Sequence, residues 1–324
     1  MKAPSKTESI SMIIHEPADV GSGIAGEGKG KQSLAARVVS QSAHSTLFFG
    51  LGFVSRLLLA VALGRGLSTH DYGTYSLVAT SLGIGVLLLQ LGVQHYIVRE
   101  VGGRDKLEAV SIFKSIVSVE AIVLPSILLI FLAIPFVRDS VAELFGFGNN
   151  RLVLVFVAVL MVVDALAQET ARYLSGRTDI ERFNEVLFLE SGLWPLLVFT
   201  VYMFGWMELS FVTVLVIWMI GPMVALLHGL RCIGVKELLQ APFDPRLYPV
   251  AIRFGYPLLG SMLATLLLGW SDRYFIASFH SAEVVGVYSY HYNIITMIVA
   301  VSAPLIASAL DPHVVAAYNL GELE

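Results

Sequence analysis

The sequence contains few of the residues that build soluble, disulfide-bonded or metal-binding proteins. Cys232 is the only cysteine, so no disulfide can form within the chain. Charged residues make up only 14% of the 324 residues, whereas about a quarter is usual for a soluble domain. No His, Cys and Asp residues have the spacing of a metal site, and no serine–histidine–aspartate set has a matching context. These absences exclude most classes of soluble enzyme.

Long apolar runs take the place of those residues. Hydrophobic residues make up 56% of the chain, the mean hydropathy is +0.75, and the runs lack the alternation of barrel strands. A transmembrane helix needs roughly 20 mostly apolar residues and pairs all its backbone groups internally. The sequence therefore predicts an all-α polytopic membrane protein with about eight transmembrane helices. The predicted windows are about 44–64, 75–97, 115–137, 152–174, 183–205, 209–230, 254–278 and 287–309.

The basic residues are distributed unequally between the two sides of these windows. Sixteen of the 21 Lys and Arg residues lie in the N-terminal segment and the connections on its side, and three lie on the other side. Arg56 and Arg273 are the two that fall inside windows. Because basic connections stay in the cytoplasm, the pattern predicts that both termini are cytoplasmic.

The polar segments are short or low in complexity. Residues 1–42 are predicted to be a disordered cytoplasmic tail. Within them, GIAGEGKG at 23–30 approaches a phosphate-binding loop, but Gly30 replaces the required Ser or Thr and no strand precedes it. The longest connections, 138–151 outside and 231–253 inside, leave no room for a catalytic domain. We therefore expect no enzyme activity, cofactor, metal or nucleic-acid partner.

Ionisable residues inside the windows are the candidates for function. Each costs from about 2.5 kcal/mol upward in the bilayer, so it is expected to face a cavity or a partner. Arg56 lies near the middle of its window, and Asp164 shares a helical face with Gln168 and Arg172. The others are Glu120, Glu169, Glu190, Asp272 and Arg273. Their spread over five windows predicts a polar chamber between helices.

Structural ion pairs are the alternative for some of these residues. Glu169 and Arg172, at i and i+3 near a helix end, suit a local pair. Asp272 and Arg273 point about 100° apart and cannot pair with each other. Tyr288, Tyr290 and Tyr292 fit interfacial anchors better than a sugar-stacking platform, because a spacing of two spreads them around a helix.

One short phrase occurs twice in the chain. STHDYGTYS at 68–76 and SAEVVGVYS at 281–289 match at four positions with an offset of 213 residues. Each copy is predicted to form an outer turn between two windows, in which the Gly opens the turn and Tyr–Ser begins the returning helix. The offset spans six windows, an even number, so the two units enter the membrane with the same polarity. They are interpreted as parallel repeats.

These repeated regions resemble a known family. LAVALGRGLSTHDYGTYSLVATSLGIGVLLLQLGVQHYIVRE and RFGYPLLGSMLATLLLGWSDRYFIASFHSAEVVGVYS look like the starts of the two bundles of polysaccharide biosynthesis export proteins, the O-antigen flippases of the multidrug/oligosaccharidyl-lipid/polysaccharide exporter superfamily. The resemblance implies alternating-access transport of a polyprenyl-diphosphate-linked oligosaccharide across the cytoplasmic inner membrane. It implies Arg56 and then Arg273 as diphosphate contacts. It also implies Asp164, Glu169, Glu190, Asp272 or Glu120 as cavity or ion-coupling residues, and names membrane lipids, a polysaccharide polymerase and glycosyltransferases as partners.

The predicted domains depart from the family pattern. They are a tail at 1–42, a six-helix bundle at 43–232, a cytoplasmic linker at 233–253, and two helices of a second bundle at 254–324. Family members carry about 12 to 14 spans, so the resemblance implies a truncated chain or one completed by another polypeptide. The alternatives are a multidrug cation exporter of the same superfamily and a membrane fragment that does not transport.

Overall fold

The computed structural model describes residues 34–144, 151–296 and 299. The contacts within the chain divide it into two units, residues 1–39 and residues 40–324. The motif at 23–30, most of the predicted tail and about half of the window at 287–309 lie outside the described residues.

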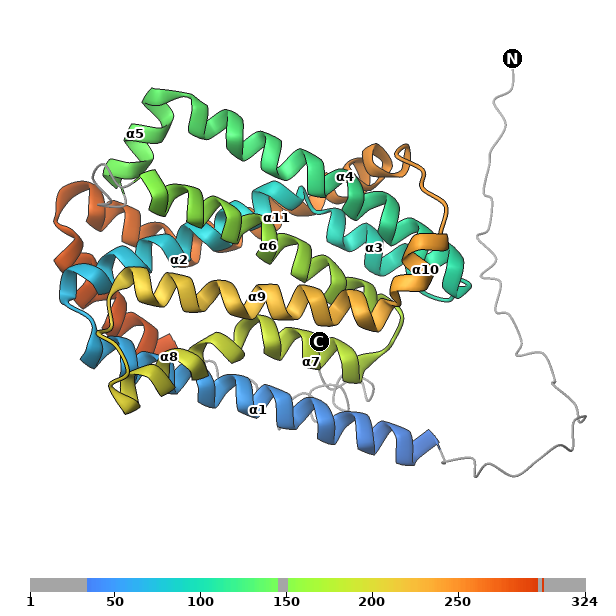
Figure 1. Ribbon diagram of the computed structural model, residues 1–324, viewed down its shortest axis with the longest axis horizontal. Coiled ribbons are helices and arrows are strands. Elements are labelled where there is room, and N and C mark those ends of the chain that lie inside the picture. Colours follow the sequence, from blue (N-terminus) through green and yellow to red (C-terminus); the bar gives the residue numbers. More distant parts are fainter. Residues whose placement is uncertain (1–33, 145–150, 297–298, 300–324) are drawn as a thin grey trace, which may run out of the picture. The chain divides into compact units, whose positions relative to one another are not determined.

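Helices make up the described part of the second unit, which contains no strand (Figure 1). Residues 282–296 form a further helix after the labelled ones. The labelled helices are α1 Leu34–Gly66, α2 Thr69–Gln90, α3 Val93–Val101, α4 Lys106–Ala133, α5 Pro135–Leu144, α6 Arg151–Gly176, α7 Ile180–Ser191, α8 Leu193–Phe204, α9 Phe211–Ile233, α10 Val235–Gln240 and α11 Leu247–Phe279.

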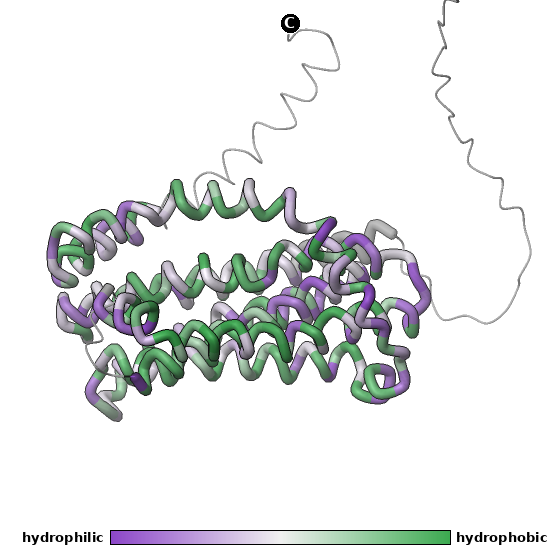
Figure 2. Tube along the Cα trace, turned by 90° about the horizontal axis from the view of Figure 1, so that it is seen from above, coloured by the Kyte–Doolittle hydropathy of each residue, from purple (hydrophilic) through white to green (hydrophobic). Residues whose placement is uncertain are grey.

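The long helices confirm that this is a multi-pass membrane protein. Six of them are long and apolar enough to span a membrane, and α7 with α8 forms a seventh candidate, bent by 41°. Successive long helices alternate in direction, and hydrophilic residues gather at the end where α3, α10 and the start of α7 lie (Figures 1 and 2). Seven of the eight predicted windows therefore coincide with observed helices or helix pairs.

Two predicted continuous windows are broken helices. The window at 75–97 was expected to be one helix, but α2 ends before Leu91 and Gly92, whose φ angles are 51° and 78°. A Cβ atom at Gly92 would collide with the backbone of Gly255, so α11 passes too closely for any larger residue. In the window at 183–205, Pro195 lacks the N–H that a continuous helix needs, and the chain bends at Gly192.

The repeated phrase forms helix starts, which corrects the prediction of a turn opened by glycine. Ser68 caps α2, its hydroxyl accepting a hydrogen bond from the Asp71 backbone N–H at 3.1 Å. Gly73 therefore lies inside α2, and Gly286 lies inside the helix at 282–296. The helix begins within the repeated phrase, because a serine N-cap and an acidic residue in the first turn favour helix initiation.

The two copies of the phrase pack directly against each other. A Cβ at Gly73 would collide with the Ala282 carbonyl oxygen, and a Cβ at Gly286 would collide with the Thr69 carbonyl oxygen. Thr69 and Ala282 are themselves related by the offset of 213. Each copy therefore places its glycine on the other copy's first helical residue, which is the exchange expected around a local twofold axis. A second related pair of contacts is Tyr72 with Tyr290 and Leu77 with Val285.

Two apolar clusters hold the helices together, one toward each end of the bundle. The first includes Trp194, Val198 and Val214, and the second includes Phe113, Ile116 and Val186. Helix α6 joins both. It gives Val153, Val157 and Leu160 to the first cluster and Ala167, Ala171 and Leu174 to the second. Asp164 falls between these two sets, where α6 faces polar groups.

We predict opposite effects of adding one methyl group at two glycines. Gly73→Ala should lower the free energy of unfolding by about 1–3 kcal/mol, because its Cβ would meet fixed backbone of the other copy. Gly260→Ala in α11 has open space around it, so helix propensity should raise that free energy by up to about 1 kcal/mol. Reversible unfolding in detergent micelles measures both. Equal effects would show that the two copies do not touch.

Candidate functional site

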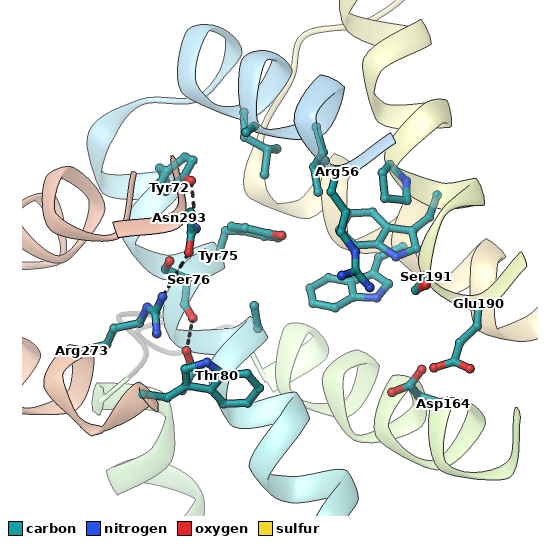
Figure 3. A pocket seen from close by; sticks show the side chains of 18 residues that line it. Arg56, Tyr72, Tyr75, Ser76, Thr80, Asp164, Glu190, Ser191, Arg273 and Asn293 are labelled. Carbon is teal, nitrogen blue, oxygen red and sulfur yellow. Dashed lines mark hydrogen bonds between the residues drawn. The ribbon is translucent and has the colours of Figure 1, made fainter. Parts of the chain in front are cut away.

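A cavity of about 400 Å³ lies among α1, α2, α6, the α7–α8 bend, α9, α11 and the helix at 282–296 (Figure 3). Four of the seven predicted site residues line it: Arg56, Asp164, Glu190 and Arg273. They come from four different helices, which are far apart in sequence. The polar chamber predicted from the cost of intramembrane charge thus corresponds to a cavity that gathers both signs of charge.

Arg273 is buried yet only partly hydrogen-bonded. Arg273 is 4% exposed, and its Nη2 donates a hydrogen bond to Asn293 Oδ1 at 3.1 Å. The guanidinium carbon lies 4.8 Å from the centre of the Tyr292 ring. Its Nε and Nη1 have no partner within the described part of the chain. Two nitrogens of a buried cation therefore lack partners, and each could donate a charge-assisted hydrogen bond to an anion that reached it.

Neighbouring side chains fix the position of this guanidinium. The Asn293 amide group donates to the Tyr72 hydroxyl at 3.3 Å, which holds the amide oxygen toward Arg273. Tyr72 in turn packs edge-on against Tyr290, with ring centres 5.8 Å apart. The contact between the two repeat copies thus extends by two hydrogen bonds to the cation, so its orientation depends on that contact.

Arg56 approaches the cavity from α1, on the side facing Glu190 (Figure 3). Its residue is exposed, and its guanidinium makes no ion pair or hydrogen bond to another described residue. It is close enough to Glu190 for their charges to interact. A mid-helix cation that borders a cavity, without a salt bridge to neutralise it, fits the expectation that it faces an aqueous space.

Asp164 and Glu190 form the acidic wall, and their carboxylates point toward each other (Figure 3). Gln168 Nε2 donates to Asp164 Oδ2 at 3.2 Å. Glu190 Oε2 is buried with no partner among the described residues, and Glu190 lies just before the bend at Gly192. The bend therefore places this carboxylate at the end of a short helix, facing the cavity.

Aromatic residues form the rest of the wall, and the charge-based prediction missed them. The indole rings of Trp194 and Trp218 are stacked 4.5 Å apart at 15°, and Tyr75 lies 5.8 Å from Trp218. Trp270 lines the cavity from α11. Tryptophans usually gather at membrane interfaces, and these three lie inside their windows. That unusual position was the available signal in the sequence.

Asp272 does not line this cavity, although its neighbour Arg273 does. Its carboxylate accepts hydrogen bonds from the Tyr288 hydroxyl and from the Arg273 backbone N–H, the latter at 2.8 Å. The two side chains do not pair, as their spacing predicted. Tyr288, Tyr290 and Tyr292 contact Asp272, Tyr72 and Arg273 respectively. Their interfacial anchoring stays a prediction.

Glu120 and Glu169 form a separate buried pair outside the cavity. Both are 0% exposed, and none of their four carboxylate oxygens has a partner in the described ranges. The expected pair of Glu169 with Arg172 forms no hydrogen bond or salt bridge among the described residues, although the two charges lie close enough to interact. Glu169 also lies near Glu120 of α4, and Arg172 borders a second cavity beside Gln168. The Tyr248 hydroxyl, also buried and without a partner, lies near both carboxylates.

A model of the family described as polysaccharide biosynthesis protein matches residues 36–316, which is most of the chain. No curated protein and no solved structure gives a significant match. The match covers every helix that contributes to the cavity.

We predict that the buried carboxyl pair destabilises the fold. Glu120→Met removes two buried oxygens that lack partners and keeps a side chain of similar volume, so the free energy of unfolding should rise by about 1–3 kcal/mol. Glu108→Met on the exposed face of α4 should change it by less than about 0.5 kcal/mol. Reversible unfolding in micelles provides the measurement. A loss of stability in Glu120→Met would show that this carboxyl is satisfied.

Proposed function

The chain belongs to the polysaccharide biosynthesis protein family, and we propose that it is a flippase for a polyprenyl-diphosphate-linked oligosaccharide. In this role it is a transporter and not an enzyme. It moves the lipid-linked substrate between the leaflets of the cytoplasmic inner membrane for surface polysaccharide synthesis. A polymerase and glycosyltransferases that use the same lipid are its proposed partners, together with the membrane lipids around it.

Arg273 is the observation that carries the proposal. A buried guanidinium with two unpaired nitrogens is costly unless an anion completes its hydrogen bonds, and it lines a cavity that Arg56 also borders. A diphosphate has enough oxygens to engage two guanidinium groups at once. The stacked Trp194 and Trp218 offer an apolar surface next to this anion site.

The contact between the repeat copies supports alternating access. Two hairpins, α1 with α2 and α11 with the helix at 282–296, meet at one end of the bundle through Gly73 and Gly286, and α11 is also contacted farther along, at Gly83 of α2 and at Gly92 after it. Both hairpins reach the cavity. With both termini in the cytoplasm, as the basic residues predict, this contact closes the outer end. Separation of the two copies would then open the cavity outward.

The acidic residues take two different roles in this proposal. Asp164 and Glu190 balance the charge of the two arginines that line the same cavity. Glu120 and Glu169 form the site of a coupling cation, whose entry would satisfy the unpaired oxygens and the nearby Tyr248 hydroxyl. Glu120→Met should then lower transport although it raises stability, which separates a functional carboxyl from a structural one.

A cation exporter of the same superfamily is the second candidate, and one observation favours it. Asp164, Glu190 and three tryptophans line the cavity, and carboxylates with aromatic rings also bind organic cations. In the flippase the arginines contact the ligand, whereas in the cation exporter the carboxylates and tryptophans contact it. Loss of the arginines should therefore weaken the binding of a diphosphate and favour the binding of an organic cation.

We predict that purified protein in lipid nanodiscs binds geranylgeranyl diphosphate. Three of its four tryptophans line the cavity, so intrinsic fluorescence reports occupancy. Arg273→Gln should weaken binding about 10- to 100-fold, because charge-assisted hydrogen bonds are lost. Arg246→Gln, at an exposed position before α11, is the matched control and should bind as the wild type does. Unchanged affinity in Arg273→Gln, or preferential binding of tetraphenylphosphonium, would favour the cation exporter.

We predict further that Arg56→Ala lowers surface glycan in a flippase-deficient strain that expresses the protein. The amount of protein in the membrane should stay the same, because the Arg56 side chain is exposed and unpaired within the described residues. Immunoblotting of membranes and glycan staining of whole cells give the two values. Export equal to that of the wild type would remove Arg56 from the proposed diphosphate site.

A further inference from the structure

A second cavity, of about 340 Å³, opens between α2, α3, α6 and α11. Its polar lining consists mainly of uncharged groups, and Arg172 is the one charged residue among the described residues that line it. Gln90, Gln94 and Gln168 line this space from α2, α3 and α6, and Ser261 and Thr265 line it from α11. No carboxylate contributes to the lining, so a cation has no counter-charge there.

Gln94 shows that this cavity is built for a polar occupant. The residue is 3% exposed, and its Oε1 has no hydrogen-bond partner within the described part of the chain. A buried amide oxygen without a partner carries the cost of its lost hydration with no hydrogen bond in return. Gln90, which is 2% exposed, is held in place by its Nε2, which donates to the Ala165 carbonyl at 3.2 Å. The amide of Gln90 is therefore held in place, and the buried amide of Gln94 lines the same cavity.

The chemistry of the lining selects the class of ligand. An amide both donates and accepts hydrogen bonds, and so does each hydroxyl of a sugar. Val86, Leu87 and Leu266 add apolar surface against which the C–H groups of a sugar ring can pack. An acyl chain would leave the amides unpaired, and a diphosphate would find one cation instead of two.

The two cavities adjoin each other along α6. Gln168 of the second cavity donates to Asp164 of the first at 3.2 Å, and the two residues are separated by one helical turn, about 6 Å. On the opposite side, Trp270 of the first cavity packs against Gly83 of the second. A ligand with two chemically different parts can therefore occupy both spaces.

We propose that the second cavity binds sugar residues of the lipid-linked oligosaccharide through the amides of Gln90, Gln94 and Gln168, while the diphosphate occupies the cavity of Arg56 and Arg273. This proposal rests on the proposed function and adds the position of the carbohydrate. Gln94 satisfies its amide oxygen by accepting a hydrogen bond from a sugar hydroxyl. Arg172, exposed at this cavity, provides a further donor.

Binding by the wild-type protein and Gln94→Leu in nanodiscs tests the proposal. The probes are geranylgeranyl diphosphate, the same lipid carrying N-acetylglucosamine on its diphosphate, and the neutral dodecyl glycosides of glucose, galactose and N-acetylglucosamine. Tryptophan fluorescence and thermal shift both report binding. The wild-type protein should prefer the glycosylated diphosphate to the bare one about tenfold. Gln94→Leu should abolish that preference and leave the affinity for the bare diphosphate unchanged, because one buried hydrogen bond is lost.

Two further variants make the result specific. Gln168→Leu changes a half-buried position and should reduce the preference in the same way if Gln94→Leu does not fold. Gln240→Leu, exposed at the end of α10, is the matched control and should leave every affinity unchanged. A preference for the glycosylated lipid that survives in both cavity variants would overturn the proposal.

The neutral glycosides separate this proposal from the proposed function. If the wild-type protein binds neither diphosphate but binds a glycoside in a manner that depends on Gln94, the sugar site stands and the flippase proposal fails. If the bare diphosphate binds and no sugar-bearing probe responds to Gln94→Leu or Gln168→Leu, the flippase proposal stands and the sugar site is refuted.

Discussion

The close contact between the two copies of the repeated phrase determines where the charges lie. Gly73 meets Ala282 and Gly286 meets Thr69, so two hairpins separated by 213 residues share one backbone surface. This contact sets the start of α2 against the start of the helix at 282–296, and α1 and α11 lead into these two starts through short links. It consequently brings Arg56 and Arg273, which lie upstream of the two copies, to one cavity. Only glycine permits such an approach, because any Cβ would occupy the position of a carbonyl group on the other copy.

The cavity brings positively charged and negatively charged side chains together. Arg56 and Arg273 approach from the two hairpins, and Asp164 and Glu190 approach from α6 and α7. Charges in a low-dielectric environment interact strongly, so groups of opposite sign on the two walls attract each other even though Arg56 forms no direct pair within the described residues. An anionic ligand would add contacts to the arginines and repel the carboxylates. Such a ligand would therefore change the forces between α6 and the hairpins, which are the parts that move in the proposed transport cycle.

Much of this arrangement could be predicted from the cost of burying charge and from hydropathy. Arg56 and Asp164 stand out because no apolar environment accepts them without compensation. Hydropathy could not predict the helix breaks at Gly92 and Gly192, because it continues through them, although Pro195 was a sequence signal for the second. The first depends on the approach of Gly255 from α11, and the second on the position of Pro195. The hydropathy of a segment shows whether it can lie in a membrane, whereas a break in its helix also depends on the residues that pack against it.

The neutral parts of the site were harder to recognise than the charged ones. Trp194, Trp218 and Gln94 carry no net charge, so the free-energy cost of placing them in a membrane is small. The search for charged residues inside the windows therefore missed them. Glu120 and Glu169 were predicted as cavity or ion-coupling residues because burying their charge is expensive. They lie near each other and Tyr248 and do not line the cavity, and their ion-coupling role stays a prediction. The free-energy cost of burying a charged residue shows that the residue needs a partner. Only the packing of the helices shows which residue that partner is.

Helix α6 is the element that connects all of these polar groups. Asp164, Gln168 and Arg172 follow one another at intervals of four residues, so they form a single stripe that lines first one cavity and then the other. Glu169 lies about 100° around the same helix and faces α4. A rotation or shift of α6 cannot change one of these surroundings alone, since the helix backbone is rigid over two turns. A cation that bound at Glu169 and a substrate that bound along the stripe would therefore act on the same rigid body. Each would favour the position of α6 that satisfies its own contacts, which is the condition for energetic coupling between two sites.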